Sequence, residues 1–413
     1  MGSLAHDDEQ VARLVRQEKR RQRNTLSLIA AENIVSKAVM EAQGSVFTNR
    51  SVEGYPGKRY FPGMEFVDGI EALAIERAKK LFGAEHANVQ PHCGTLANVA
   101  AYQAVLTPGD TILAMELTAG GHLSHGHAGN IVSQIYRFIS YGVNRETELI
   151  DYEEVRRLAL EHRPRMIIGG ATSYPRLFDW QKLRSIADEV NAFLLADIAH
   201  LSGLVAAGVI PSPVPYADLV TSSCHKTIEG PRGGFILCKS ELSSKVDKAV
   251  FPGHQSGALE NLIAGKAVCF KLAMEPEFRT RQNQIIKNAR ALAEDLKTKG
   301  LRPVTNGTDI HLLLVDLRSK GIKGNEAENS LNEIGIMVNR NVVPGDTEPS
   351  NIASGIRIGT PPITKRGMEE KEMHIIAEII GDLLDHLGNE RVRLSLKRKV
   401  QFLCRQFPAS ELR

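Results

Sequence analysis

The segment LVTSSCHKTIEGPRGG, residues 219–234, decides how the rest of the chain is interpreted. It starts as a β-type run, passes through three small polar residues to Lys226, and ends in a Gly/Pro-rich turn at 230–234. A lysine between a buried strand end and a turn is costly unless its amine has a partner or a reaction to perform. Desolvation favours the neutral, nucleophilic amine, which can form a Schiff base with an aldehyde. We therefore expect Lys226 to form an imine, the alternative being an ordinary surface lysine.

Two further segments strengthen this interpretation. LLADIAH, residues 194–200, is an apolar run that ends in Asp197 and His200, as at the carboxyl end of a strand in a parallel sheet, where ligands bind. HCGT, residues 92–95, precedes a helical pattern, and small residues with free N–H groups at a helix start suit a phosphate. A lysine for an aldehyde, an aspartate for a pyridinium nitrogen and a phosphate cradle are the set that pyridoxal phosphate requires.

Five motifs occur along the chain: EGYPGKRY (53–60), GGHLSHG (120–126), DIAHLSGLVAAG (197–208), HKTIEGPRGG (225–234) and SGIRIGTP (354–361). In this order they resemble the motifs of the serine hydroxymethyltransferase family, which belongs to the fold-type-I pyridoxal-phosphate enzymes. The resemblance runs from about Leu26 to the C-terminus. The resemblance implies an α/β, aminotransferase-like fold with a large, mostly parallel sheet domain, an N-terminal arm and a smaller C-terminal α+β domain.

The chain pattern agrees with this architecture. Between 89 and 237 short apolar runs alternate with helical patterns, which predicts a largely parallel α/β sheet. A length of 413 residues is sufficient for two domains. We expect a helical arm at 1–30, a large cofactor-binding domain at 31–276 and a small domain at 277–413.

Local patterns predict individual elements within these domains. An exposed helix is expected at Asp7–Asn24, a helix at Glu65–Phe82 that Gly83 ends, and an amphipathic helix at Gln282–Lys299. The glycine-containing stretch Phe251–Gly265 is expected to be a loop. Further elements expected are a strand at Leu312–Val315, a turn-rich stretch at 341–354, and a long helix that buries Ile376, Ile380, Leu383 and Leu387.

Composition excludes several classes of function. Lys and Arg number 51 against 48 Asp and Glu, a balance that gives no argument for nucleic acid as a partner. Five scattered cysteines without metal-ligand spacing indicate free thiols in a reducing compartment. No apolar run approaches membrane-spanning length and no signal-peptide pattern opens the chain, so we expect a cytoplasmic protein that binds no membrane. The resemblance implies a homodimer or a dimer of dimers, with the arm packed on the partner subunit.

The catalytic residues follow from the motifs and the resemblance. Asp197 is expected to pair with the pyridinium nitrogen and keep the ring an electron sink, the alternative being a helix N-cap. His122, after two glycines, is expected to stack on the cofactor, whereas His125 is expected to be structural. The resemblance places His200 at the cofactor's phenolic oxygen.

Phosphate and cofactor contacts form a second group. Cys93, Gly94 and Thr95 are expected to hold the phosphate, with a thiol where the family usually has a hydroxyl. The remaining cofactor-binding positions implied by the resemblance are Ser51, Ser223, His225 and Gly257.

Substrate contacts form a third group, and no metal site is predicted. Arg357 carries a guanidinium fork that matches an α-carboxylate, the alternative being a salt bridge between domains. Glu53 is expected to handle protons near the substrate hydroxyl and to reach the neighbouring subunit's site. Arg232 is expected to pack locally in the glycine turn. The other substrate-binding positions are Ala31, Tyr60 and Phe61.

The chain departs from the family pattern around the substrate. Ala31 stands where the family has serine, Ser51 and Phe61 where it has tyrosine, and Ala119 where it has histidine. The run 253–257 is Gly-His-Gln-Ser-Gly instead of Gly-Gly-Gln-Gly-Gly. Each lost buried hydroxyl partner costs about 1–3 kcal/mol. Several such losses around one substrate indicate an altered specificity.

Three functions are therefore compared. The first is a hydroxymethyltransferase that cleaves serine through a glycine quinonoid and passes the one-carbon unit to tetrahydrofolate; the folate-type residues Glu53, Tyr60, Leu117, Leu123 and Asn341 favour it. The second is a folate-independent L-threonine transaldolase or aldolase that passes the glycyl unit to another aldehyde in a specialised pathway; the altered substrate residues favour it. The third is a non-catalytic homologue, against which the intact Lys226, Asp197, His122 and Arg357 argue.

Overall fold

The computed structural model describes residues 2–412, which form two compact units. One unit is Val35–Asn283, and the other combines Met1–Ile34 with Gln284–Arg413. The N-terminal segment groups with the C-terminal one because β1 (Leu26–Ser27) pairs in parallel with β13 (Ile336–Met337). The functional division into an arm, a cofactor domain and a small domain stays a prediction.

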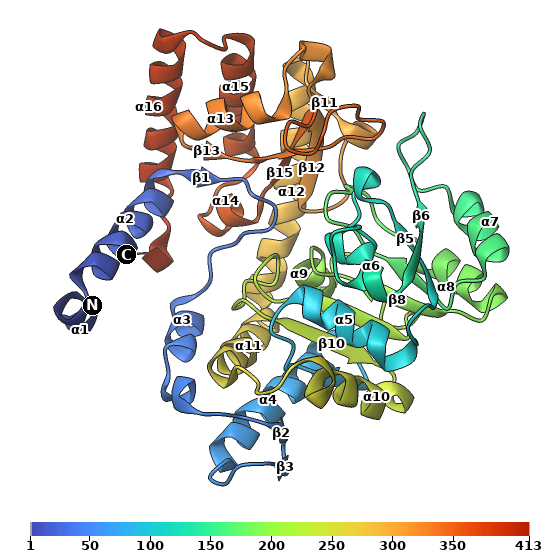
Figure 1. The fold of residues 1–413 in the computed structure, drawn as a ribbon. Coiled ribbons are helices and arrows are strands. Elements are labelled where there is room, and N and C mark those ends of the chain that lie inside the picture. The colour runs from blue at the N-terminus through green and yellow to red at the C-terminus, as the bar shows by residue number, and fades with distance from the viewer. Residues whose placement is uncertain (1, 413) are drawn as a thin grey trace. The chain divides into compact units, whose positions relative to one another are not determined.

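A seven-stranded sheet organises the unit Val35–Asn283 (Figure 1). Its spatial order is β4-β10-β9-β8-β7-β5-β6, and the neighbours from β9 to β6 run parallel, as the alternating pattern predicts. Only β10 runs antiparallel, to both β9 and β4. The strands are β4 (His86–Asn88), β5 (Thr111–Met115), β6 (Arg137–Tyr141), β7 (Met166–Gly169), β8 (Phe193–Asp197), β9 (Leu219–Ser223) and β10 (Gly234–Cys238).

This topology brings the three sequence motifs to one edge of the sheet. β8 and β9 are parallel with Asp197 opposite Thr221, so their carboxyl ends coincide. Because β10 is antiparallel to both of its neighbours, β9 and β4 run in the same direction. The carboxyl end of β4 therefore lies at the same edge of the sheet as that of β9. The chain then leaves β4 and starts α5 (Gly94–Val105). Carboxyl strand ends are where ligands bind in such sheets.

Helices cover both faces of the sheet because its strands alternate their side chains. Ile236 packs in one cluster with Ala97 and Ala101 of α5. The adjacent Phe235 points to the opposite face, where its ring lies 5.3 Å from Phe82 of α4 (Glu65–Phe82) and 5.5 Å from Phe270 of α11 (Glu260–Ala273). Strands buried on both sides are typical of parallel sheets.

The predicted helices are present with differences at some of their ends, and one predicted loop is partly helical. α4 has the predicted bounds, and Gly83 ends it in the left-handed conformation at φ 67°. α12 (Pro276–Thr298) begins earlier than predicted, with proline at its first position, where a missing N–H costs nothing. The loop predicted at 251–265 is wrong beyond residue 259, because α11 starts at Glu260. Gly265 lies within that helix, where a Cβ would come 3.2 Å from the Pro231 side chain.

The second unit contains a four-stranded antiparallel sheet of order β11-β12-β15-β14. Its apolar core joins strand residues to helices α13, α15 and α16, of which α16 is not predicted from the sequence. Leu387, predicted to lie in the long helix, follows the end of α15. The elements are β11 (Arg302–Pro303), β12 (Leu312–Asp316), β14 (Asn339–Asn341), β15 (Gly355–Gly359), α13 (Gly324–Ile334), α15 (Glu370–Asp385), α16 (Glu390–Gln406) and α2 (Glu9–Asn24).

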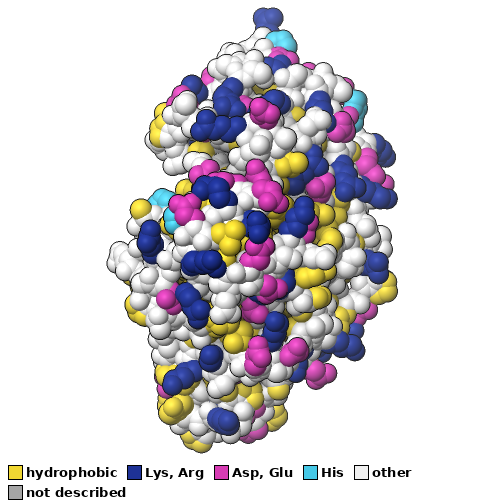
Figure 2. Space-filling model, turned by 90° about the vertical axis from the view of Figure 1, so that its right-hand side faces the viewer, with side chains coloured by type: hydrophobic (Ala, Val, Ile, Leu, Met, Phe, Trp, Pro, Cys, Tyr) yellow, Lys and Arg dark blue, Asp and Glu magenta, His cyan; other side chains and the backbone are white. Residues whose placement is uncertain are grey.

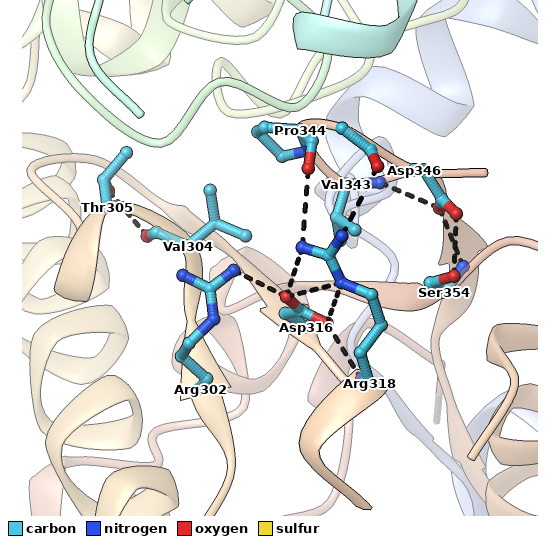
Figure 3. A network of polar contacts seen from close by, with 10 residues as sticks. Arg302, Val304, Thr305, Asp316, Arg318, Val343, Pro344, Asp346 and Ser354 are labelled. Atoms are coloured by element: carbon cyan, nitrogen blue, oxygen red, sulfur yellow. Dashed lines mark hydrogen bonds and ion pairs between the residues drawn. The ribbon is translucent and has the colours of Figure 1, made fainter. Parts of the chain in front are cut away.

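A polar network fixes the turn-rich stretch that precedes β15 (Figure 3). The buried Asp316, at the end of β12, accepts hydrogen bonds from Arg302 at 2.5 Å and Arg318 at 2.7 Å. Arg318 also lies against the Pro344 carbonyl oxygen at 3.4 Å, and Asp346 accepts from the Ser354 hydroxyl at 2.7 Å. The strand that carries Arg357 therefore begins from an anchored turn.

Shorter elements complete the description. They are α1 (Gly2–Asp7), α3 (Lys37–Gln43), β2 (Gly54–Tyr55), β3 (Lys58–Arg59), α6 (Val132–Ile135), α7 (Tyr152–His162), α8 (Trp180–Glu189), α9 (Ser202–Ala206), α10 (Ser243–Lys248) and α14 (Pro361–Lys365). Acidic and basic side chains intermix on the face shown in Figure 2, consistent with the small net charge. Within residues 2–412, every helix is too short or too polar to cross a membrane. All five cysteines are free thiols.

Candidate active site

Asp197 is held by three donors at the carboxyl end of β8. Its Oδ2 accepts from Asn98 Nδ2 at 2.8 Å and from His125 Nε2 at 3.1 Å, and its Oδ1 accepts from the Ala199 N–H at 2.9 Å. Burial would raise the pKa of Asp197, but the hydrogen bonds from His125 and Asn98 outweigh it and hold this pKa well below its usual range. The carboxylate is therefore ionised at neutral pH, which is the state that pairs with a pyridinium N–H.

The hydrogen bonds also set the tautomers of two neighbouring histidines. His125 Nδ1 accepts from the His122 N–H at 3.4 Å, so Nε2 carries the proton that His125 donates to Asp197. His122 Nδ1 accepts from the Ser124 N–H at 3.2 Å and lies 2.7 Å from the Ser124 hydroxyl. Burial is the main cause that lowers the pKa of His122 to about 4. His122 is thus a neutral, oriented ring, as stacking on a cofactor requires.

Sequence reasoning missed one member of this arrangement. Asn98 donates to both Asp197 and the Ser124 hydroxyl, and it accepts from the Thr221 hydroxyl at 2.5 Å. Its signal was a single amide on the buried alanine-rich face of α5, four residues after Gly94. His125, predicted to be structural, orients the carboxylate directly.

Three side chains of this arrangement, from two histidines and Asp197, have the spacing of a metal site. The ligand atoms of His122, His125 and Asp197 all lie within 4.8 Å of one another. The proton on His125 Nε2, however, occupies the position on that nitrogen that a metal would need. Hydrogen bonding therefore accounts for the cluster.

Lys226 follows β9 and is buried, with 9% of its surface exposed. Its charge contributes to the lowered pKa values of His122 and His225, which places it among these groups. Burial is the main cause that lowers the pKa of His225 to about 3, and the charges of Arg232 and Lys226 contribute to this lowering, so His225 is neutral. After Lys226, the Thr227 hydroxyl donates to the His200 carbonyl oxygen at 3.0 Å. The strand ends that carry Asp197 and Lys226 are thus tied together.

The start of α5 lies against the end of β9. A Cβ on Gly94 would come 3.4 Å from Ser223 Cβ, and a Cβ on Gly234 would come 2.4 Å from the Cys93 carbonyl oxygen, so only glycine fits at position 234. Cys93 is the N-cap residue of α5, and its side chain caps none of the helix N–H groups in the described chain. The N–H groups at Gly94 and Thr95 are therefore not capped by the Cys93 side chain. The donor set fits a phosphate group.

The segments around Glu53 and Gly257 pack against each other. Ser256 donates its hydroxyl to Glu53 Oε1 at 2.6 Å, and the Ala258 N–H donates to the Val52 carbonyl oxygen at 2.9 Å. His92, next to Cys93, lies with Nε2 3.0 Å from the Gly257 carbonyl oxygen. Two predicted site segments thus meet beside the loop that starts α5.

The aromatic residues of this region are exposed within one chain. Tyr60 is 70% exposed, with its ring edge-on to Phe251 at 5.7 Å, and Phe61 is 42% exposed. Ser51 is exposed as well. Within the single chain, the exposed Tyr60 therefore does not shield Glu53 from water.

Arg357 and Ala31 belong to the other unit and lie on adjoining segments. Arg357, in β15, is 7% exposed and donates from Nε to Asn339 Oδ1 at 3.1 Å. Burial lowers the pKa of Arg357 to about 10, which leaves it charged at neutral pH. At the end of β15, the Gly359 N–H donates to the Leu28 carbonyl oxygen at 2.7 Å, and a Cβ on Gly359 would come 2.5 Å from Ala30 Cα. The segment leading to Ala31 therefore lies against the end of the strand that carries Arg357.

The chain also matches a known protein family. Residues 4–380 match the family model described as serine hydroxymethyltransferase. The match spans both units and every predicted site residue.

Proposed function

The chain belongs to the serine hydroxymethyltransferase family, whose members use pyridoxal phosphate, and on that premise we propose that it cleaves the Cα–Cβ bond of β-hydroxy amino acids. The observation that carries this proposal is Asp197, held ionised by three donors on the strand next to the one that presents Lys226. When bound, the cofactor supplies the electron sink for the charge that develops at Cα.

The residues have distinct roles in this proposal. Lys226 holds the cofactor covalently, since this buried lysine follows the strand next to the one that ends in Asp197. Asp197 keeps the proton on the pyridine nitrogen. His122 presents a neutral ring that fixes the plane of the cofactor. Gly94 and Thr95 present helix N–H groups to the phosphate.

Substrate handling is proposed for residues outside this cluster. Arg357 binds the α-carboxylate, because a buried guanidinium matches a carboxylate with two parallel hydrogen bonds. Glu53 accepts the proton of the β-hydroxyl group as the Cα–Cβ bond breaks. The Ser256 hydroxyl binds one carboxyl oxygen of Glu53 and leaves the other for this task.

A second candidate is favoured by a specific observation in the sequence. Ala31 and Phe61 lack the hydroxyl groups with which the family holds the substrate, and Ser51 lacks a phenol. Polar contacts of this kind carry strong discrimination between similar substrates. A threonine transaldolase or aldolase that releases acetaldehyde and passes the glycyl unit to another aldehyde is therefore the alternative to folate-dependent transfer.

The test is to incubate the holoenzyme with L-serine or L-threonine, with and without tetrahydrofolate, and to measure glycine and aldehyde. Cleavage of either amino acid supports the proposal, and its dependence on tetrahydrofolate separates the two candidates. A strong preference for serine with an absolute need for tetrahydrofolate would overturn the altered specificity. Failure to cleave both substrates by a protein that has bound the cofactor would overturn the proposed reaction.

A further inference from the structure

A second buried lysine lies beneath the phosphate cradle. Lys266, in α11, is 2% exposed and stands in the otherwise apolar run IAGKAVCF. Its ammonium group donates to three backbone carbonyl oxygens: Val89 at 2.5 Å, Gly234 at 2.8 Å and Pro91 at 3.1 Å. An ammonium group has three N–H donors and no acceptor, so these three carbonyl oxygens match its full capacity.

The three carbonyl groups belong to the two segments that form the cradle. Val89 and Pro91 lie on the loop that leads from β4 to Cys93, and Gly234 starts β10. The Gly234 N–H donates in turn to the Pro91 carbonyl oxygen at 2.9 Å. Lys266 therefore joins the loop and the strand through one positive charge.

The glycine turn makes room for this lysine. A Cβ on Gly233 would lie 2.5 Å from Lys266 Cε, and a Cβ on Gly234 would overlap the Cys93 carbonyl oxygen. The absence of a side chain at Gly233 leaves room for the Lys266 side chain, and its absence at Gly234 leaves room for Cys93, the N-cap residue of α5. The Lys266 amine and the start of α5 therefore both lie against the beginning of β10.

The three carbonyl oxygens around the Lys266 amine favour its protonated form, because each accepts one of its N–H groups. Burial lowers the pKa of Lys266, and the neighbouring Cys224, Glu71 and Glu260 oppose this lowering only in part. Glu71 is fully buried, pairs with Arg59 and accepts from Gln90, the residue between Val89 and Pro91. A phosphate dianion at the start of α5 adds a further negative charge on this side.

We propose that Lys266 is a positioning residue for the cofactor phosphate. It does not touch the reacting atoms; it holds the carbonyl groups of the 89–91 loop and of Gly234 inward, which fixes where α5 presents its first N–H groups. The inference rests on the proposed placement of the phosphate at Cys93, Gly94 and Thr95. In this proposal Lys266 acts on the position of the phosphate group, and Lys226 remains the lysine that reacts with the aldehyde group of the cofactor.

The test uses Lys266→Met, which keeps the length of the side chain and removes the donors. Tyr141→Phe is the matched control, since it removes a buried hydrogen bond of 2.8 Å to the Ile168 carbonyl oxygen in the same unit. Dissociation constants of the purified proteins are measured for pyridoxal phosphate and for pyridoxal, which lacks the phosphate, and the ³¹P resonance of the bound cofactor is recorded.

We expect Lys266→Met to bind pyridoxal phosphate roughly tenfold more weakly, with little change for pyridoxal and a shifted ³¹P resonance. Tyr141→Phe is expected to lower the thermal midpoint without changing the ratio of the two affinities. Equal weakening for both ligands, or unchanged affinity for pyridoxal phosphate, would overturn the proposal. If Lys266→Met does not fold, Lys266→Gln, which keeps two N–H donors, serves in its place with a smaller effect of the same selectivity. Failure of the proposed cofactor site itself is distinct, because the unmodified protein would then bind neither ligand.

Discussion

His125 offers a direct way to measure how strongly the site holds Asp197 in its ionised form. Replacing it by phenylalanine keeps a flat ring but removes the Nε2 donor, which lies 3.1 Å from Asp197 Oδ2. The His125 side chain is 1% exposed, so water cannot take the place of the lost donor without rearrangement. His125→Gln is the matched control because its side-chain amide can still donate.

The expected magnitude follows from the contacts that remain. A buried hydrogen bond to a charged group contributes about 1.5–3 kcal/mol. Asn98 at 2.8 Å and the Ala199 N–H at 2.9 Å still bind the carboxylate, so the loss should lie near the lower end, about 2 kcal/mol. His125→Gln should lose less than half of that amount.

The assay uses the one tryptophan of the chain. Trp180 lies in α8, in the same unit as Asp197, and its buried ring stacks on Phe178 at 5.4 Å. Its fluorescence during urea unfolding of the cofactor-free protein therefore reports on this unit, and the absence of cofactor removes the stabilisation that binding would add.

The pH dependence provides a second check. The folded-state pKa of Asp197 is depressed, so its stabilising contribution is present above its ordinary value of about 4 and is lost as the pH falls through the folded value. The variant lacks part of this depression. The difference between the proteins should hold from about pH 8 to pH 6 and shrink below about pH 4. A loss under about 0.5 kcal/mol, or equal losses in both variants, would refute the reasoning.

Three other predictions test separate parts of the chain. Glu260 has buried carboxyl oxygens with no hydrogen-bond partner among residues 2–412, and burial together with the Glu71 charge raises its pKa to about 8. Because this folded-state pKa is raised, the stability that Glu260 contributes at low pH is lost as the pH rises toward 8, so Glu260→Gln should raise the urea midpoint more at about pH 8.5 than at pH 6. A gain in the midpoint that does not grow with pH would contradict this. Phe61→Tyr should move the ratio of kcat/KM values from threonine towards serine, by up to about tenfold, and an unchanged ratio would show that the phenol is irrelevant. The minimal active unit should be a dimer, since the site segments 46–63 and 251–257 are expected to contact the neighbouring subunit; a fully active monomer in light scattering would exclude it.

The edge of the sheet was predictable because each motif ends a strand. An apolar run followed by Asp197 or by Lys226 indicates a carboxyl strand end, and parallel strands bring such ends together. Helix α4 was equally predictable, because its apolar spacing and Gly83 both lie within the helix itself. These predictions depend on residues close together in the sequence.

The features that were missed depend on contacts between distant residues. Asn98 and Lys266 are single polar residues among apolar neighbours in their helices. Their partners, Asp197 and the carbonyl groups of the cradle, lie far away in the sequence. Gly265 lies in the stretch predicted as a loop, although it allows close packing of α11 against Pro231. The pairing of Leu26 with Ile336 joins the two ends of the chain, and no local pattern indicates it.

The measurement that tests the central claim most directly is the location of the covalently bound cofactor. The holoenzyme is reduced with borohydride and digested, and the peptide that carries the pyridoxyl group is identified by mass spectrometry. We predict a single label on Lys226 and, for Lys226→Ala, a folded protein with no label. A label on Lys266, the other buried lysine beside the cradle, or a label that persists in Lys226→Ala, would contradict the account.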